Sequence, residues 1–396
     1  MSGRIIEPGS ILGVLGGGQL GAMFAGAARR MGYLIAVWDQ DPDAPAQRLG
    51  DYSFTASFSD IGAREKFSNL VQAVTFEWEN VPAELCAWLE QRHAVRPSSA
   101  VLKIIQDRVE QKQFLQSNGL PVAPFVGIES PDQLADAVKH LGIPSICKTA
   151  TAGYDGKGQW RISQQLDVEE VGRILRTIEQ PAPRWIIEQA VEFERELSVL
   201  VARGPDGECR TYPVVENRHE RGILRMTLAP STVSSHIAVR SSDLARQAVA
   251  LLKGVGVFCV ELFHTPDDHL FINEIAPRPH NSGHYTLDAC TVSQFEQQVR
   301  AVCGSPLGEV RQLSPAVMVN LIGAEAQMVT SGLGFNDLLS TPGARLHLYG
   351  KKVVRPGRKM GHVTFLADTG EEALELAHRF MMRFMSDLRN LKSPAT

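Results

Sequence analysis

Short apolar runs alternate with amphipathic stretches in the first hundred residues. Ile11 to Leu15 form an apolar run that ends in glycines, and small and apolar residues at helical spacing follow it. Two further apolar runs, residues 33–38 and 73–76, end in aspartates and in polar residues. This pattern predicts strand-helix-strand units of a parallel sheet. Ligands bind beyond the carboxyl ends of such strands, so Glu77 and Asn80 are expected to face that crevice.

The next segment predicts one continuous amphipathic helix over residues 99–119, with Ser98 or Ser99 as its cap. Gly119, just before Pro121, ends the pattern. We expect this helix to be the hinge between a first and a second domain.

Alternating strands and turns dominate the middle of the chain. Residues 145–163 predict a strand, a glycine-rich loop and a second strand. Residues 184–203 and 258–277 each predict a pair of antiparallel strands. Residues 343–367 are again rich in strand pattern, and 370–390 predict a final amphipathic helix.

Composition narrows the class of protein. A chain of 396 residues has room for two or three domains. Lys and Arg number 40 against 44 Asp and Glu, which is not the basic excess of a nucleic-acid binder. The six cysteines show no zinc spacing, and no signal peptide or long apolar run is present. We therefore expect a cytoplasmic protein without a membrane span.

The first glycine-rich turn fits G-x-G-x-x-G at Gly16, Gly18 and Gly21, with Asp39 about twenty residues on. A dinucleotide is one interpretation. Another phosphate ligand is a second, because a helix start offers free N–H groups to any phosphate. A tight turn without a ligand is the third, and the turn alone does not decide among them.

The second glycine-rich loop, residues 153–159, lies between two predicted strands and lacks the helix and Lys-Ser/Thr pair of a P-loop. Its glycines and Lys157 suit a mobile flap over polyphosphate, and Lys148 adds a second charge on the preceding strand. A simple flexible hairpin is the alternative. The adjacent Tyr154 and Asp155 favour the flap.

Two acids interrupt consecutive apolar strands. Glu261 and Glu274 sit near the middle of these strands, with Asn273 beside the second acid. Buried carboxylates are costly unless they are paired or bind a metal. Two carboxylates and an amide oxygen suit magnesium, whereas two exposed acids paired with lysines are the alternative.

Two polar segments remain. Residues 277–284 combine Arg278, His280, Asn281, Ser282 and a second histidine in a segment shaped by proline and glycine, which suits an anion. The most basic stretch lies at 351–359, where a proline-glycine turn can direct cations inward toward a small phosphorylated substrate. A solvated basic face is the usual alternative.

The order of these motifs resembles the ATP-grasp superfamily, and within it the N5-carboxyaminoimidazole ribonucleotide synthetase family. The segments that carry the resemblance are GGGQLG, FEWENVP, GYDGKGQ, NEIAPRPHNSGH and RPGRKMGH. The resemblance implies a mixed α/β and α+β ATP-grasp fold. Its parts are a Rossmann-like parallel-sheet domain (1–110), an ATP-grasp domain (111–305) with a mobile glycine-flap subdomain (about 148–200), and a small β-rich C-terminal domain (306–396). Ala152 and Trp78 depart from the family pattern.

By resemblance, the chain is a ligase of purine (IMP) biosynthesis. It would use ATP and Mg2+ to carboxylate aminoimidazole ribonucleotide with bicarbonate, through carboxyphosphate, and would act as a homodimer. The implied ATP contacts are Arg108, Lys148, Gly153, Tyr154, Asp155, Gly156, Lys157, Gly158, Gln159, Glu188, Gln189, Ala190, Val191, Glu196, His219, Asn273 and Glu274.

The remaining implied roles concern the metal and the substrate. Glu261 and Glu274 would hold the metal. The substrate contacts would be Gln19, Leu20, Glu77, Asn80, Arg278, His280, Asn281, Ser282, Lys351 and Arg358. The catalytic group would comprise Tyr154, Asp155, Lys157, Arg278 and Lys351.

The resemblance also changes the interpretation of the first turn, which is now expected to face the single phosphate of the ribonucleotide. Rival functions are another ATP-grasp ligase, for example one that uses formate, and an NAD-dependent oxidoreductase. The second rests only on the first turn and Asp39 and leaves the flap, the acid pair and the 277–284 loop unexplained.

Overall fold

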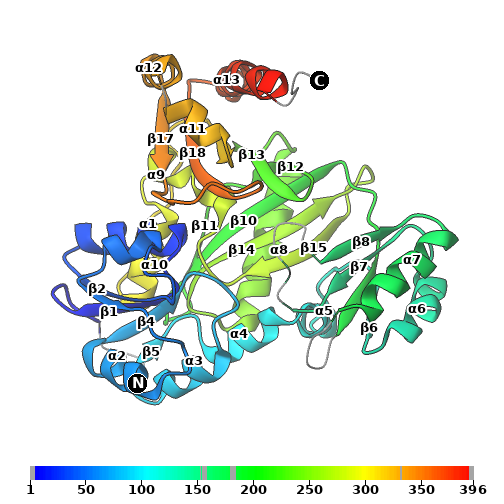
Figure 1. Ribbon diagram of the computed structural model, residues 1–396, viewed down its shortest axis with the longest axis horizontal. Coiled ribbons are helices and arrows are strands. Elements are labelled where there is room, and N and C mark those ends of the chain that lie inside the picture. The colour runs from blue at the N-terminus through cyan, green and yellow to red at the C-terminus, as the bar shows by residue number, and fades with distance from the viewer. Residues whose placement is uncertain (1–4, 152, 154–157, 179–183, 331, 392–396) are drawn as a thin grey trace.

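The strands form three sheets in the part of the chain that the computed structural model describes, residues 5–151, 153, 158–178, 184–330 and 332–391. Figure 1 shows a parallel sheet at the N-terminal side, a large central sheet, and a small sheet with α6 and α7 set to one side. The expected mixed α/β and α+β architecture is confirmed.

The first sheet is parallel, as the strand-helix-strand pattern predicted. Its order is β3-β2-β1-β4-β5, and neighbouring strands within it pair in parallel. Trp38 and Phe67, both fully buried, lie in the core on one face. The elements are β1 (Ile11–Leu15), α1 (Gln19–Arg30), β2 (Leu34–Trp38), β3 (Tyr52–Phe54), α2 (Ile61–Leu70), β4 (Ala73–Phe76), α3 (Ala83–Glu90) and β5 (Ala94–Val95).

The predicted continuous helix over 99–119 is wrong, because it is broken at Asp107. Two helices, α4 (Ser99–Gln106) and α5 (Arg108–Ser117), flank this residue, whose backbone is extended (φ −112°, ψ 117°). The Asp107 carboxylate accepts hydrogen bonds from the N–H groups of Val109 and Glu110, so it caps α5. The break places Arg108 at the first position of a new helix.

The small sheet has the order β6-β9-β7-β8, with antiparallel pairings. The hairpin on either side of the glycine loop is confirmed, since Lys148 on β7 pairs with Gln159 on β8. The predicted pairing within 184–203 is wrong, because β9 and β10 belong to different sheets. The elements are β6 (Phe125–Ile128), α6 (Leu134–Leu141), β7 (Ser145–Thr149), β8 (Gln159–Ile162), α7 (Gln165–Arg176) and β9 (Trp185–Gln189).

The large sheet has nine strands, and its main path runs β15-β14-β10-β12-β13-β16-β18-β17. The C-terminal strands therefore extend the central sheet and form no separate sheet among the described residues. Strand β15 lies at the opposite edge. The strands are β10 (Arg195–Arg203), β11 (Cys209–Thr211), β12 (Val215–Glu220), β13 (Ile223–Ala229), β14 (Gly256–His264), β15 (Leu270–Ala276), β16 (Ala316–Ile322), β17 (Ala344–Leu348) and β18 (Lys359–Leu366).

Helix α10 joins the central sheet to the N-terminal sheet. Its apolar side packs with α1 and β1 in one core, where Phe295 and Val299 are fully buried. Gln298 bonds to both sheets, donating to Thr75 and accepting from the Val257 N–H. Burial on both sides fixes the two sheets relative to each other. The remaining helices are α8 (Ser235–Leu252), α9 (Thr286–Ala289), α10 (Gln294–Cys303), α11 (Glu325–Thr330), α12 (Gly332–Ser340) and α13 (Gly370–Leu391).

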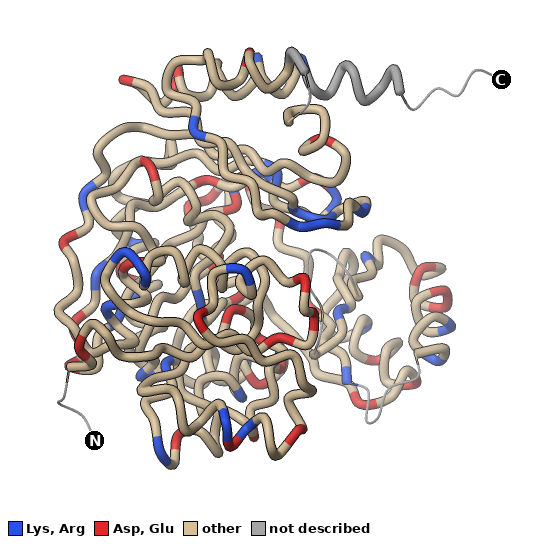
Figure 2. Tube along the Cα trace, turned by 60° about the vertical axis from the view of Figure 1, so that its left-hand side comes forward, with Lys and Arg blue, Asp and Glu red and all other residues tan. Residues whose placement is uncertain are grey.

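Charged residues of both signs are interspersed along most of the described trace, and Figure 2 also shows one conspicuous stretch in which Lys and Arg gather. This agrees with the balanced composition. Among the described residues, no helix is both long and apolar enough to cross a membrane.

Candidate functional site

The first glycine-rich turn is closed by carboxylates of the chain itself. Glu77, directly after β4, accepts hydrogen bonds from the N–H groups of Gly18 and Gly21, and Asp39 accepts from Gly17 at 2.6 Å. Gly16 has a φ of 95°, and a Cβ at Gly18 would overlap the Glu77 carboxylate.

The expectation that these amides face a phosphate is therefore wrong for Gly17, Gly18 and Gly21. Anions do favour a helix N-terminus, but here the anion is a side chain. The same contacts remove the dinucleotide interpretation, because Asp39 binds the turn where that interpretation needs it to bind a ribose. Gln19 and Leu20, which begin α1, remain predicted substrate contacts at this turn.

The loop after β15 faces the end of the first sheet. Nη2 of Arg278 lies 2.7 Å from Oε1 of Glu79, in the segment that follows β4. Asn80, next in that segment, is exposed. The ion pair brings the 277–284 loop to the carboxyl end of the parallel sheet, where ligands of such sheets bind.

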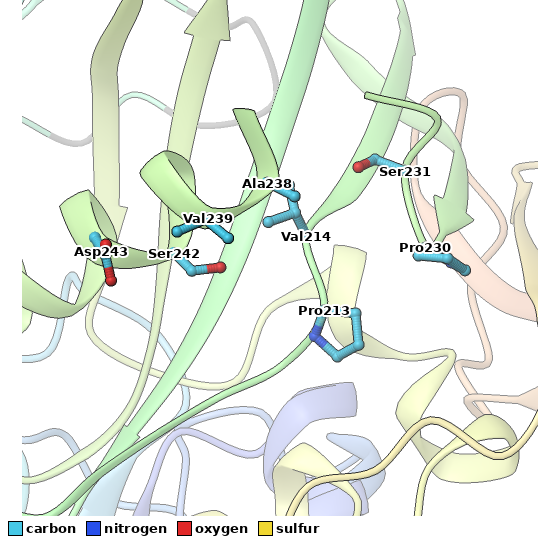
Figure 3. Close-up of a pocket in the computed structure, with 8 residues that line it drawn as sticks. All are labelled: Pro213, Val214, Pro230, Ser231, Ala238, Val239, Ser242 and Asp243. Carbon is cyan, nitrogen blue, oxygen red and sulfur yellow. The ribbon is translucent and has the colours of Figure 1, made fainter. Parts of the chain in front are cut away.

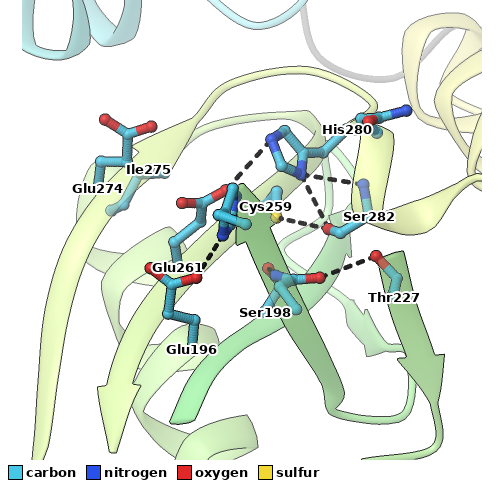
Figure 4. Close-up of polar contacts among 12 residues, drawn as sticks. Glu196, Ser198, Thr227, Cys259, Glu261, Glu274, Ile275, His280 and Ser282 are labelled. Carbon is cyan, nitrogen blue, oxygen red and sulfur yellow. Dashed lines mark hydrogen bonds and ion pairs between the residues drawn. The ribbon is translucent and has the colours of Figure 1, made fainter. Parts of the chain in front are cut away.

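His280 has its protonation state set by its neighbours. Its Nδ1 accepts from the N–H of Ser282 (3.3 Å) and contacts the Ser282 hydroxyl (2.8 Å). Burial and the nearby cation Arg278 lower the pKa of His280 well below its usual value. A neutral ring with an accepting Nδ1 carries its proton on Nε2, which lies 3.2 Å from Oε1 of Glu261. His280 thus donates to Glu261 as a neutral residue (Figure 4).

The side chains of Asn281 and Ser282 are buried within the chain. Asn281 exchanges two hydrogen bonds with the amide of Asn320 on β16. Ser282 is fully buried beside His280 and Cys259. In this structure they support the loop, and their contact with substrate stays a prediction.

The acid pair lies on paired strands. Glu261 on β14 and Glu274 on β15 are direct cross-strand partners, so both side chains leave the same face of the sheet. The register then shifts, which leaves Asn273 as the extra residue of a β-bulge. A bulge next to a site changes the direction of a side chain. Here Asn273 is the inserted residue and stands directly beside Glu274.

Burial and mutual repulsion make it unfavourable for both Glu261 and Glu274 to be ionised without a cation between them. Burial and, next, the charge of Glu274 raise the pKa of Glu261 to about 7, although the charge of His219 opposes the shift. Glu274 meets Arg108, with Nη2 at 3.5 Å from Oε2. Two carboxylates and an amide oxygen match the ligands that Mg2+ prefers, and a cation there would relieve the repulsion.

Three elements meet at Arg108. Its Nη2 also donates to the carbonyl of Gly153 (3.3 Å), and its backbone N–H donates to Ala150. The predicted ATP residue on α5, the start of the flap and the predicted metal strand are therefore in contact.

The lysine predicted for the phosphates, Lys148, forms an ion pair with Glu188 on β9. Both are buried. The following residues Gln189, Ala190 and Val191 leave β9 toward β10, and Ala190 donates to the carbonyl of Pro144 (3.0 Å). The small sheet thus contributes the Lys148–Glu188 pair, and the end of β9 leads from this sheet to β10 of the large central sheet.

Glu196 and His219 are brought together on β10 and β12 by a short contact between Oε2 and Nδ1. Burial disfavours the charged imidazole, but the hydrogen bond and charge of Glu196 outweigh it and raise the pKa of His219. Figure 4 shows Glu196 near Glu261 and Glu274. Carboxylates predicted to hold the ribose and the metal therefore share one side of the central sheet.

The basic stretch forms the connection between β17 and β18. Lys351 donates to the carbonyl of Lys359 (2.8 Å) and Arg358 to that of Val353 (2.8 Å), so these cations shape their own turn. Lys352 pairs with Asp43 of the first domain. The C-terminal segment is thereby tied to the region after β2.

Several predicted residues lie outside the described part of the chain. Four of them belong to the predicted flap: Tyr154, Asp155, Gly156 and Lys157. Ala152, which departs from the family pattern, lies outside the described residues as well. Their assignments stay predictions. Of the predicted flap, Gly153, Gly158 and Gln159 are described.

Two pockets differ in their relation to this site. One of about 350 Å3 lies between α8 and the segments around Pro213 and Pro230, and Asp243 is its one charged lining residue (Figure 3). It touches none of the predicted residues. The other, about 500 Å3, is lined by Trp78, Asn80, Gln106 and Thr151, among others. It lies between the end of the parallel sheet and the approach to the flap.

Sequence reasoning missed Lys112. This lysine is buried on α5, four residues after Arg108, and its Nζ lies 3.0 Å from Oε1 of Glu188. The available signal was its place on the apolar stripe of the helix, with Val109 and Leu115. A lysine on an apolar face needs a partner, which the one-dimensional pattern does not identify.

A histidine cluster was also missed. His347 and His362 are cross-strand partners whose rings stack at 4.5 Å with 15° between planes, and His284 lies 4.8 Å from His362. Asp288 lies near them, 2.9 Å from His347. The ligand atoms of Asp288, His347 and His362 lie within 4.8 Å of one another. In this structure the cluster packs the C-terminal strands against the 277–284 loop and the helix after it.

Family models match nearly all of this chain. A ribonucleotide synthetase preATP-grasp domain matches residues 10–106, an ATP-grasp domain 113–295, and a phosphoribosylaminoimidazole carboxylase C-terminal domain 316–376. The three matches follow the order of the motifs along the sequence.

Similar full-length proteins include N5-carboxyaminoimidazole ribonucleotide synthases. That of Bacillus subtilis is 41% identical over 384 residues, 97% of this chain and 98% of the relative. That of Brucella melitensis is 39% identical over 359 residues, 91% of this chain and 97% of the relative.

Solved structures agree with these relatives. An ADP complex of an N5-carboxyaminoimidazole ribonucleotide synthetase is 40% identical, with a TM-score of 0.91 over 97% of this chain and 99% of its own. An Aspergillus clavatus N5-carboxyaminoimidazole synthase, in complex with ADP and 5-aminoimidazole ribonucleotide, is 34% identical, with a TM-score of 0.84 over 95% and 98%.

Proposed function

The chain belongs to the N5-carboxyaminoimidazole ribonucleotide synthase family, and from that premise we propose how its residues carry out the reaction. It is an ATP-dependent ligase of purine biosynthesis that converts 5-aminoimidazole ribonucleotide, ATP and bicarbonate to N5-carboxyaminoimidazole ribonucleotide. Bicarbonate is a poor electrophile. We propose that ATP first transfers its terminal phosphate to bicarbonate and leaves as ADP, and that the carboxyphosphate so formed carboxylates the substrate amine with release of phosphate.

One observation carries the proposed ATP site: Arg108 contacts both Glu274 and the flap residue Gly153. It joins residues assigned to ATP on three separate elements. Arg108, Lys148 and Lys157 would neutralise the phosphates during transfer. Glu188 to Val191 would border the adenine, and Glu196, oriented by His219, would hold the ribose.

Magnesium fits the acid pair, because the raised pKa of Glu261 comes from its burial and from the charge of Glu274, and a bound cation would offset both. Glu261 and Glu274, with Asn273 beside them, would hold it. Bound there with ATP, Mg2+ would neutralise phosphate charge and orient the terminal phosphate for transfer.

The ribonucleotide would lie between the end of the parallel sheet and the 277–284 loop. Arg278 and His280 border this space, and Glu77 closes the adjoining turn. Lys351 and Arg358 would approach its phosphate from the β17–β18 connection. Closure of the flap, with Tyr154 and Asp155, would keep water from the carboxyphosphate.

We further propose that the chain divides near residues 110 and 305, that it acts as a homodimer, and that it works in the cytoplasm. Sedimentation of the purified chain tests the dimer, because a single species at the monomer mass would contradict it.

A magnesium titration tests the metal assignment. Steady-state rates are measured against Mg2+ for the wild type, Glu261→Gln and the surface control Glu129→Gln. The acid variant should need far more Mg2+ for half of its maximal rate, while the control should match the wild type. Equal Mg2+ requirements in all three would remove Glu261 from the metal site.

A further inference from the structure

A second buried lysine stands behind the one assigned to the phosphates. Lys112 on α5 is 3% exposed. Its Nζ lies 3.0 Å from Oε1 of Glu188, and Lys148 pairs with the other oxygen, Oε2. Two lysines from different elements, α5 and β7, therefore share one carboxylate on β9.

The charges of this group are fixed by their mutual contacts. Burial alone would raise the pKa of Glu188, but the ammonium groups of Lys148 and Lys112 outweigh it and lower the pKa to about 2. Glu188 is therefore a carboxylate at any working pH. Burial lowers the pKa of Lys112, and the charge of Glu188 opposes that shift. With both lysines protonated and Glu188 ionised, the group carries a net charge of one positive.

That surplus charge matters when ATP binds. A lysine that turns toward a phosphate must leave its carboxylate, and a buried carboxylate without a partner is strongly unfavourable. If Lys148 were the sole partner of Glu188, phosphate and Glu188 would compete for it. Lys112 keeps the Glu188 charge compensated after Lys148 turns away.

We propose that Lys112 is a positioning residue for ATP: it neutralises Glu188, so that the charge of Lys148 is available to the phosphates. The proposal rests on the assignment of Lys148 to ATP under the proposed function. Lys112 touches no reacting atom and acts through Glu188.

The surroundings of Lys112 suit this role. Its ammonium group also donates to the carbonyl of Ile272 on β15 (3.1 Å), next to Asn273 and Glu274. The same ammonium thus joins the small sheet to the edge strand of the large sheet, and ATP is proposed to lie between these sheets. These two contacts hold the Lys112 ammonium group between Glu188 and β15.

The neighbouring residue offers a matched control. Gln111 is also buried on α5 and accepts from the N–H of Ile275 at 2.9 Å, so it too anchors β15. It carries no charge, and its side-chain hydrogen bonds within the described residues go to the backbone of Ile105 and Ile275, not to Glu188. A merely structural role for Lys112 predicts that the two residues behave alike.

The test compares KM for ATP, kcat and melting temperature in Lys112→Met, Gln111→Met, Glu188→Gln and the double variant Lys112→Met/Glu188→Gln. Lys112→Met should raise KM for ATP about tenfold or more, as expected when one partner of a buried charge group is lost. The double variant removes the carboxylate that needs compensation, so it should recover most of that loss when the effect of Glu188→Gln alone is allowed for: its KM should rise far less than the product of the two single-variant increases. Gln111→Met should lower the melting temperature but change KM by less than about twofold.

Three outcomes would overturn the proposal: an unchanged KM in Lys112→Met, equal KM shifts in Lys112→Met and Gln111→Met, or no recovery in the double variant. If Lys112→Met does not fold, the double variant is compared with Glu188→Gln. Glu188→Gln leaves two buried lysines without their shared carboxylate, so it should have the higher KM for ATP and the lower melting temperature of the two. A double variant no better than Glu188→Gln would then overturn the proposal. Lys148→Met serves separately, because an unchanged KM for ATP there would contradict the ATP assignment itself.

Discussion

Replacement of Glu77 by alanine should loosen the first turn of α1. The Glu77 carboxylate accepts from the N–H groups of Gly18, the N-cap residue, and Gly21, and the N-cap itself provides no side-chain cap. A hydrogen bond to a charged group contributes roughly 1.5 kcal/mol at the lower end of its range, which is the appropriate end for a partly buried carboxylate. Two such bonds give about 3 kcal/mol, or roughly a hundredfold change in a local opening equilibrium.

Hydrogen–deuterium exchange of peptides covering residues 16–24 measures this opening directly, without assuming two-state unfolding of a chain with several domains. Glu77→Ala should speed exchange there about a hundredfold, Glu77→Gln should fall between it and the wild type, and the exposed control Glu129→Ala should change nothing. Wild-type exchange rates in Glu77→Ala would refute the claim that this carboxylate closes the turn.

The same residue gives a pH dependence. Burial raises the pKa of Glu77 above its usual value, and the hydrogen bonds from Gly21 and Gly18 only partly oppose this. The folded protein then binds a proton more tightly than the unfolded chain, so the stabilising contribution is present at low pH and is lost as pH rises through the folded pKa. The difference in unfolding free energy between wild type and Glu77→Ala should be larger at pH 5 than at pH 8, and the reverse order would contradict the sign.

Three further predictions follow from the site. Glu274→Gln should abolish turnover while leaving the circular dichroism spectrum unchanged; undiminished activity would remove this residue from the metal site. Asp107→Ala removes the cap of α5 and should destabilise the protein by about 1 kcal/mol in denaturant unfolding, and an unchanged midpoint would count against the cap. The His280 ring should stay neutral between pH 6 and 8 in histidine NMR spectra because its pKa is lowered; a titration midpoint in that range would contradict the assigned tautomer.

The local pattern of apolar and polar residues was sufficient to predict the parallel sheet, the strand pair on either side of the flap loop, and the closeness of Glu261 and Glu274. Each depends on a signal of short range: apolar runs with turn chemistry, or two acids on strands joined by a tight turn. The register that pairs Glu261 with Glu274 follows from that turn. The family resemblance added the assignments of function, ATP and substrate.

Contacts between segments that are distant in the sequence could not be predicted from local pattern. The helix break depends on Asp107 turning its side chain back to cap α5, although the apolar period continues across the break. The strands β9 and β10 are adjacent in sequence but belong to different sheets. The N–H groups of the first glycine turn have no partner nearby in the sequence, because Glu77, which accepts from them, follows a different strand, β4. Lys112 likewise needs a partner from β9.

This chain couples ATP to the carboxylation of 5-aminoimidazole ribonucleotide. The most direct test is the rate of ADP formation by the purified protein with Mg2+-ATP while bicarbonate and the ribonucleotide are supplied separately, together, or with formate in place of bicarbonate. We expect the full rate only when bicarbonate and 5-aminoimidazole ribonucleotide are both present. Full turnover with formate, or full turnover without the ribonucleotide, would contradict it.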